Sequence, residues 1–202
     1  MKSGKLFGAF LIVGFLVFSG GCHFHFDETD DSGCVLSRER ELKDFYGVTL
    51  EGAGNVNIYL AEDYRVVVTT GNNNHDIITT KVHGNKLCID EKRNRCGDST
   101  KLTVDIYMPE LNTVSLQGVG TIRIINGKTS NFEINLSGVG TIDAQNFEAE
   151  DVVVNLSGTG DIKTWASKSL SGKLSGIGDV MYKGMPEKRN VNRTGIGTVK
   201  TL

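Results

Sequence analysis

The sequence predicts an all-β protein: a parallel β-solenoid of 18–20-residue coils, preceded by a less regular N-terminal β cap of longer strands. Three observations predict this fold class. A glycine motif repeats at a nearly constant interval, apolar and polar residues alternate beside its copies, and no repeat unit has a helix-length apolar pattern. The chain of 202 residues also has 25 glycines but only 2 prolines, which favours tight turns in regular structure over a disordered linker.

Each copy of the motif consists of glycine, any residue, glycine, a polar residue and a β-branched residue. The six copies begin at Gly52, Gly118, Gly138, Gly158, Gly176 and Gly195, and the last five recur with a nearly constant period. Leucine stands two residues before the first five copies, and valine or isoleucine stands four residues after the first glycine in all six. Because the flanking positions repeat as well, the motif indicates architecture rather than a phosphate loop.

The segments beside the motif read as short strands with one apolar side. In "NFEINLSG", Phe132, Ile134 and Leu136 alternate with polar residues. Such strands bury that side when coils stack at about 4.8 Å, so that the leucines and isoleucines form interior columns. A sharp corner calls for a positive φ or a close backbone approach, and glycine allows both without strain. We therefore expect the corners at Gly118, Gly120, Gly138, Gly140, Gly158, Gly160, Gly176, Gly178, Gly195 and Gly197.

The chain divides into three predicted parts. These are a signal peptide (1–21), a lipidated cysteine with an acidic tether (22–43), and a β-solenoid head (44–202) with an irregular first half (44–110) and regular coils (111–202). In the first half the period fails between Gly52 and Gly118, and we expect longer strands there, some in antiparallel hairpins, that cap the stack. In the last copy Arg193 replaces the column leucine. Because the edge of this last coil is only partly protected from pairing with another chain, we expect end-to-end self-association.

The first 22 residues predict export and a lipid anchor. Two lysines, an apolar run over residues 6–18 and small residues precede Cys22, as in a signal peptide. A transmembrane anchor is the alternative, but crossing the bilayer takes about 20 residues. Cys22 resembles the acylated cysteine of bacterial lipoproteins, although Ser19 replaces the usual aliphatic residue. Several acyl chains would hold the protein firmly to the membrane. By the same resemblance, His23 implies the outer membrane of the cell envelope, on its periplasmic or surface face.

The remaining cysteines and the tether histidines suggest further sites. An exported chain permits disulfides, and Cys88 and Cys96 flank a polar loop that a bridge would close. Cys34 could instead pair with either of them. Between lipid and head we expect a solvated tether, with a metal on His23 and His25 as the alternative. Since no CxxC metal pattern is present, we expect neither a metal nor any other cofactor.

Three stretches resemble a known family: "YGVTLEGAGNVNIYLAEDYRVVV", "KLTVDIYMPELNTVSLQGVG" and the serial "LSGxGDI" units, of which "LSGTGD" is one. Over about residues 44–201 the chain resembles the bacterial "putative auto-transporter adhesin, head GIN domain" family. The resemblance implies a β-solenoid domain on exported, often lipid-anchored envelope proteins. It also implies an adhesive role, and it supplies no catalytic residues.

We expect a non-catalytic module for binding, adhesion or structural support, with a membrane contact through the lipid and a glycan or protein ligand on the cell surface. One face is predicted to carry a stack of asparagines, Asn135, Asn155 and Asn192. Such a polar row is also typical of any strand face exposed to solvent. Nearby stand Ser137, Ser157 and Ser175. Trp165 could stack on a sugar, although corner packing is the simpler role. A net charge of −2 argues against nucleic acid as a partner.

Two alternatives remain open at this point. Parallel β-helices include carbohydrate-active enzymes, and Asp161 and Asp179 would be stacked acids, but no Ser/His/Asp spacing stands out. A calcium-binding repeat has a similar period, but threonine occupies the polar motif position in three of the regular coils.

Overall fold

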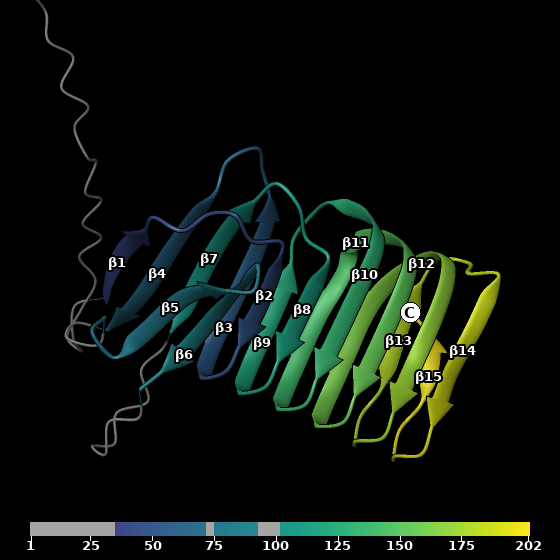
Figure 1. Ribbon diagram of the computed structural model, residues 1–202. Helices are drawn as coiled ribbons and strands as arrows, with labels where there is room; N and C mark the ends of the chain where they lie inside the picture. The colour runs from purple at the N-terminus through teal and green to yellow at the C-terminus, as the bar shows by residue number, and fades with distance from the viewer. Residues whose placement is uncertain (1–34, 72–74, 93–101) are drawn as a thin grey trace, which may run out of the picture. The chain divides into compact units, whose positions relative to one another are not determined.

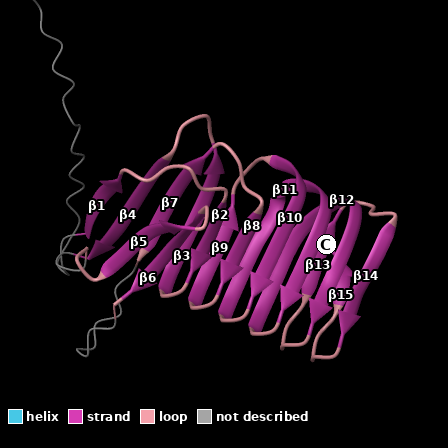
Figure 2. Cartoon of the chain, viewed as in Figure 1, coloured by secondary structure: helices cyan, strands magenta, loops and turns pink. Residues whose placement is uncertain are grey.

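The computed structural model describes residues 35–71, 75–92 and 102–202. The predicted signal peptide and tether histidines lie outside these residues, as do Cys22, Cys34 and Cys96. Within the described part the chain forms strands, turns and loops and no helix, and fifteen strands join one sheet with parallel and antiparallel pairs (Figures 1 and 2). The predicted all-β class is confirmed.

The strands are short at both ends of the chain and long in the middle. In chain order they are β1 (Val35–Arg40), β2 (Gly47–Leu50), β3 (Ala53–Leu60), β4 (Arg65–Gly71), β5 (Ile78–His83), β6 (Lys86–Glu91), β7 (Thr103–Met108), β8 (Thr113–Leu116), β9 (Val119–Ile124), β10 (Lys128–Leu136), β11 (Val139–Leu156), β12 (Thr159–Leu174), β13 (Val180–Lys183), β14 (Lys188–Arg193) and β15 (Val199–Thr201).

Two parallel ladders run through the repeats, one on each side of the glycine motif. Before the motif, β2, β8, β10, β11, β12 and β14 pair in that order. After it, β3, β9, β11, β12, β13 and β15 pair in that order. Leu136 pairs with Leu156, and Gly140 pairs with Gly160. Each motif residue therefore lies beside its equivalent in the next copy, so the sequence period equals the pairing register.

The first motif copy belongs to the same ladders although a long segment separates it from the second copy at Gly118. Leu50 pairs with Leu116 and Gly54 with Gly120. The intervening chain extends both ladders outward instead of interrupting them. On one side β7 pairs with β3, followed by antiparallel β4 and β1, and on the other β6 pairs with β2, followed by antiparallel β5 (Figure 1). One antiparallel hairpin, β5–β6, is present in this half as expected, and β1, β4 and β7 form antiparallel pairs between strands distant in sequence.

The segments that return the chain from one motif copy to the next are extended strand in the middle coils. β11 has 18 residues and β12 has 16, so each continues from one motif copy to the next as extended chain. Register shifts between Asp143 and Glu148 and between Ala149 and Asp151 accommodate the bend. Phe132 and Phe147 pack edge to face beside this bend, with ring centroids 4.8 Å apart. Paired backbone and a buried aromatic contact favour strand over loop here.

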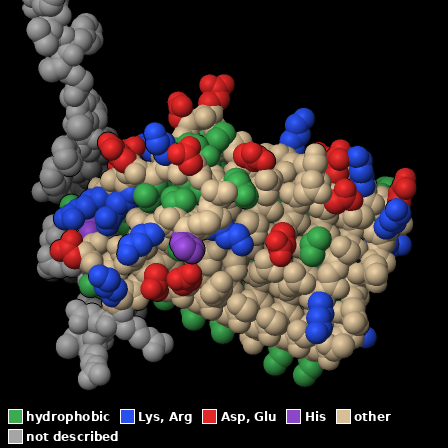
Figure 3. All heavy atoms as spheres, viewed as in Figure 1, with side chains coloured by type: hydrophobic (Ala, Val, Ile, Leu, Met, Phe, Trp, Pro, Cys, Tyr) green, Lys and Arg blue, Asp and Glu red, His purple; other side chains and the backbone are tan. Residues whose placement is uncertain are grey.

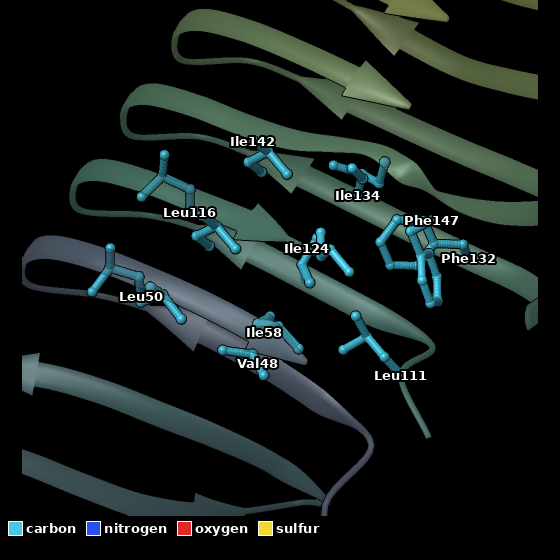
Figure 4. Packing of buried hydrophobic residues seen from close by; sticks show 14 of the residues in the cluster. Val48, Leu50, Ile58, Leu111, Leu116, Ile124, Phe132, Ile134, Ile142 and Phe147 are labelled. Atoms are coloured by element: carbon cyan, nitrogen blue, oxygen red, sulfur yellow. The ribbon is translucent and has the colours of Figure 1, made fainter. Parts of the chain in front are cut away.

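The core includes the columns that the motif predicts. Leu50, Leu116, Leu136, Leu156 and Leu174 are buried, as are the valines and isoleucines after the glycines up to Val180. Figure 4 shows Leu50, Leu116 and Ile142 of these columns. Burial of each such side chain stabilises the fold by about 1.5–3 kcal/mol. The columns weaken in the last coil. There Arg193 is exposed, Val191 and Val199 are only half-buried, and β14 and β15 each pair on one side.

Candidate binding groove along the glycine corners

A shallow groove of about 580 Å³ follows four consecutive glycine corners. Its floor is the first glycine of each motif copy, from Gly138 to Gly195. One wall is the residue before this glycine, and we call these four residues the serine row: Ser137, Ser157, Ser175 and Thr194. The other wall is formed by the residues between the glycines. The groove therefore crosses the coils, and each coil contributes the same three positions.

We call the residues between the two glycines of the five regular corners the corner ridge: Val119, Val139, Thr159, Ile177 and Ile196. All five are exposed, including Val139 at 51%, Ile177 at 53% and Ile196 at 72%. Green side chains project along the lower edge of the molecule in Figure 3, where Figure 1 places these turns. In register along the corners, Val119 lies beside Val139 and Ile177 beside Ile196, with Thr159 between the two apolar pairs. Exposed apolar patches mark interaction sites more often than single exposed residues do.

Glycine is required at both corner positions for different reasons. Gly140 has a φ of 142°, a conformation that side-chain-bearing residues rarely adopt. Gly138 has an ordinary φ, but a Cβ there would collide with the carbonyl oxygen of Gly118 in the preceding coil. The same two conditions hold at the other regular corners. The absence of a side chain at these corners allows the backbones of successive coils to approach closely.

The backbone of the groove is already hydrogen-bonded. The N–H groups of Val139, Thr159, Ile177 and Ile196 each donate to a glycine carbonyl of the preceding coil at 2.9 Å. The hydroxyl of Ser175 lies 3.5 Å from the Leu156 carbonyl oxygen, whereas those of Ser137 and Ser157 make no hydrogen bond within the described part of the protein. What the groove offers a ligand is therefore a row of hydroxyls beside a row of apolar side chains.

Two aspartates follow the ridge and cap the backbone of the next coil. The carboxylate of Asp161 accepts the N–H of Asp179 at 2.9 Å, and that of Asp179 accepts the N–H of Thr198 at 2.8 Å. Asp179 also accepts the Lys200 ammonium at 2.7 Å. The hydrogen bonds from Lys200 and Thr198 lower the pKa of Asp179 to about 2, and the bond to Asp179 raises the pKa of Lys200. The carboxylate oxygens of Asp161 and Asp179 therefore bond neighbouring coils to each other, and the two aspartates are stacked as the sequence predicts.

Asp161 and Asp179, the acids of the enzyme alternative, are neighbours, and each carboxylate accepts a backbone N–H of the next coil. Within residues 35–71, 75–92 and 102–202, no three histidine, cysteine or acidic side chains are close enough to hold a metal ion. His75 is buried, and its Nε2 bonds the Leu36 carbonyl oxygen at 2.8 Å. Burial lowers the pKa of this imidazole. Its role is thus structural, within the hairpin region of the first half.

The predicted asparagine row is only partly correct. Asn155 donates to the Asn135 side chain at 2.9 Å, as stacking requires. Lys173 then stands between Asn155 and Asn192 in the ladder, so the row is interrupted after two members. The motif spacing predicts which positions align in the ladder, whereas the residue type at an aligned position changes from one unit to another.

Trp165 and Cys88 lie away from the groove. Trp165 is half-buried on β12 and packs against the turn at Gly184, consistent with corner packing. Cys88 lies on β6, where burial raises the pKa of its thiol. Its predicted partner Cys96 lies outside the described residues, and the disulfide stays a prediction.

The corner ridge was missed at the sequence level. Its signal was present, because the residue between the glycines is alanine, valine, threonine or isoleucine in all six copies and is never charged. A solvated turn position has no reason to exclude charge so consistently.

Along the described ranges, no helix has the length and apolar character needed to cross a bilayer.

The fold and its repeated glycine motif define an all-β repeat protein. The chain belongs to the family described as "Putative auto-transporter adhesin, head GIN domain", whose model matches residues 44–126 and 113–186. These overlapping matches span well over half of the chain, which confirms the family resemblance seen in its motifs.

A solved structure shows the same fold. It is a "putative adhesin" from Bacteroides fragilis that is 22% identical, with a TM-score of 0.57 over 85% of this chain and 98% of that one. A "putative cell adhesion protein" from Clostridium sporogenes is 14% identical, with a TM-score of 0.46 over 83% of this chain and 98% of that one. No curated protein matches the sequence.

Proposed function

We propose that the protein is an exported, lipid-anchored module of the cell envelope that binds a surface ligand through its glycine-corner groove and catalyses no reaction. The observation that carries the proposal is the corner ridge. Three aliphatic side chains and a threonine, at positions 139, 159, 177 and 196, are exposed in register beside a row of hydroxyls. Exposing them to water is unfavourable, and a bound ligand would offset that cost. Membership of an adhesin head family supports the same role.

We further propose that the head is a β-solenoid. The support is the register, because equivalent residues pair across every consecutive motif copy, and the coils enclose continuous aliphatic columns. A rigid stack of this kind holds the groove walls in fixed positions. Ligand binding would then cost little conformational entropy on the protein side.

The proposed anchor is acylated Cys22, with the outer membrane as the address. The apolar run before Cys22 and the absence of aspartate after it support this assignment. Cells fed an alkyne-labelled fatty acid should label the wild-type chain and not the Cys22→Ala variant, and the mature N-terminus should be Cys22 by mass spectrometry. An unlabelled wild-type chain that keeps residues 1–21 would contradict the anchor.

Adhesion assays test the binding role directly. Bacteria displaying the full chain would be compared on immobilised cell walls, mucin and extracellular-matrix proteins. We expect adhesion to at least one surface, and loss of most of it in the double variant Val139→Asp/Ile177→Asp, which places two carboxylates on the ridge. Val153→Asp is the matched control, since Val153 is also an exposed valine of β11 but lies outside the groove. Equal adhesion of all three proteins would refute the groove as the binding site.

The open edges of β14 and β15 also support the proposed end-to-end pairing. Both strands have unpaired backbone groups on one side. Like charges oppose the contact, because Lys188, Arg189 and Arg193 are exposed on β14. We therefore expect self-association only at high ionic strength, where these charges are screened.

A further inference from the structure

We propose that the ligand of the groove is an uncharged, linear glycan that lies across the coils, with its C–H faces on the corner ridge and its hydroxyls against the serine row. This inference rests on the proposed binding function and adds the chemical class of the ligand. Three properties of the groove carry it: its charge, its bonded backbone and its narrow width.

The groove carries no charge. Glycine, serine, threonine, valine and isoleucine line it, and neither an acid nor a base does. The nearest charged residue along the chain is Arg193, which precedes Thr194 and donates to the Gly197 carbonyl oxygen at 2.8 Å, and Asp161 and Asp179 lie two residues after ridge positions. Nucleic acids, phosphorylated peptides and anionic lipid headgroups call for cations, which would supply charge-assisted hydrogen bonds. An uncharged ligand is the complement of this lining.

The bonded backbone argues against an extended peptide. Peptides that add to a sheet gain affinity from main-chain hydrogen bonds to unpaired strand edges. Here the N–H groups of the ridge residues already donate to the preceding coil, as in the 2.9 Å bond from Val139 to Gly118. The ridge N–H groups are therefore taken, and the side-chain polar groups that face a ligand in this groove are hydroxyls. They match a ligand that carries hydroxyls of its own.

The narrow width argues against a second copy of the chain. Twelve residues line the groove. Stable protein interfaces use about 20–30 residues on each side. A groove with one residue per coil on each wall fits a single polymer strand better than a protein surface.

The dimensions and chemistry suit a short run of sugars. Four coils at a spacing of about 4.8 Å give a groove about 14 Å long. A pyranose ring has an apolar C–H face and a hydroxyl rim, so the Val139 and Ile177 side chains can contact the face while Ser137 and Ser157 meet the rim. The groove is shallow and has no aromatic platform, so we expect weak affinity per molecule. Many copies on one surface would raise it through multivalency.

Calorimetry on the full chain in detergent tests the inference. The neutral probes are cellohexaose, chitohexaose and maltohexaose, and the charged probe is an oligogalacturonate hexamer. We expect at least one neutral probe to bind, with a Kd that is independent of salt and about tenfold tighter than that of the charged probe. Val139→Asp/Ile177→Asp should weaken this Kd by about tenfold, and Val153→Asp should leave it unchanged. Methyl NMR shifts confined to the ridge would identify the contact surface.

The outcomes separate this inference from the binding function. If no neutral hexamer binds or competes while adhesion still depends on the ridge, the glycan assignment is wrong and the binding module stands. In that case a protein or lipid ligand takes its place. If a neutral hexamer binds equally well to the ridge variant, the groove assignment is wrong. If adhesion and hexamer binding are both absent, both proposals fail.

Discussion

At the scale of single residues, the second glycine of each corner is the strictest requirement of the fold. Gly140→Ala combines an unfavourable φ with a collision against the Gly120 carbonyl oxygen. We expect it to lower the free energy of unfolding by about 1–3 kcal/mol or more. Gly84→Ala is the matched control, because Gly84 also has a positive φ, of 55°, but a Cβ there meets nothing within 4 Å. Urea unfolding measures both, and an equal loss would show that the close approach between coils is unimportant.

Asp179 gives the fold a pH dependence with a definite sign. Its pKa in the folded protein is about 2, below the ordinary value of 3.8, because Lys200 and Thr198 donate to its carboxylate. The stabilising contribution is therefore complete above pH 3.8 and is lost as the pH falls from there toward 2. Asp179→Asn should flatten this part of the profile of melting temperature against pH. A variant profile that parallels the wild type between these values would contradict the assignment.

At the scale of elements, the column leucines of β10, β11 and β12 should be energetically equivalent. Leu136→Ala, Leu156→Ala and Leu174→Ala each remove a buried side chain between two neighbouring coils. Each should lower the free energy of unfolding, measured by chemical denaturation, by about 2–5 kcal/mol.

At the edge of the stack, Arg193→Leu extends the column by one member. It should raise the melting temperature and strengthen end-to-end association, measured by sedimentation velocity at high salt. A strictly monomeric Arg193→Leu protein at high salt would contradict the end-to-end pairing.

The strands beside the motif were predictable from the sequence. Apolar and polar residues alternate in them with a period of two, and their partner segments recur at the period of the motif. The continuous β11 was not, because its bend around Phe147 depends on the aromatic contact with Phe132 from another coil. The pairing of β2 with β8 was also missed, since nothing in the sequence shows that the intervening strands extend the ladders on the far side of β2 and β3. The groove was hidden because only the stacking aligns single exposed residues such as Val139 and Ile177 into a row.

At the scale of the whole molecule, the central claim is that successive motif copies lie on top of each other, including the first copy. Residues before the motif, such as Glu51, Gln117 and Thr194, then lie in one line along the corners. Neighbouring members are one coil apart, about 4.8 Å, and Thr194 lies five coils from Glu51, about 24 Å. This order differs from the sequence, where Glu51 and Gln117 are separated by the whole of β3 to β8.

Electron paramagnetic resonance tests this order most directly. Spin labels would be attached to cysteines replacing two of these exposed residues, with the native cysteines changed to serine. The pair at positions 51 and 117 should show strong dipolar broadening from contact between neighbouring coils, and the pair at 51 and 194 should show a separation of about 24 Å. Absence of broadening in the first pair, or a shorter distance in the second, would contradict the stacked arrangement and the continuous groove built on it.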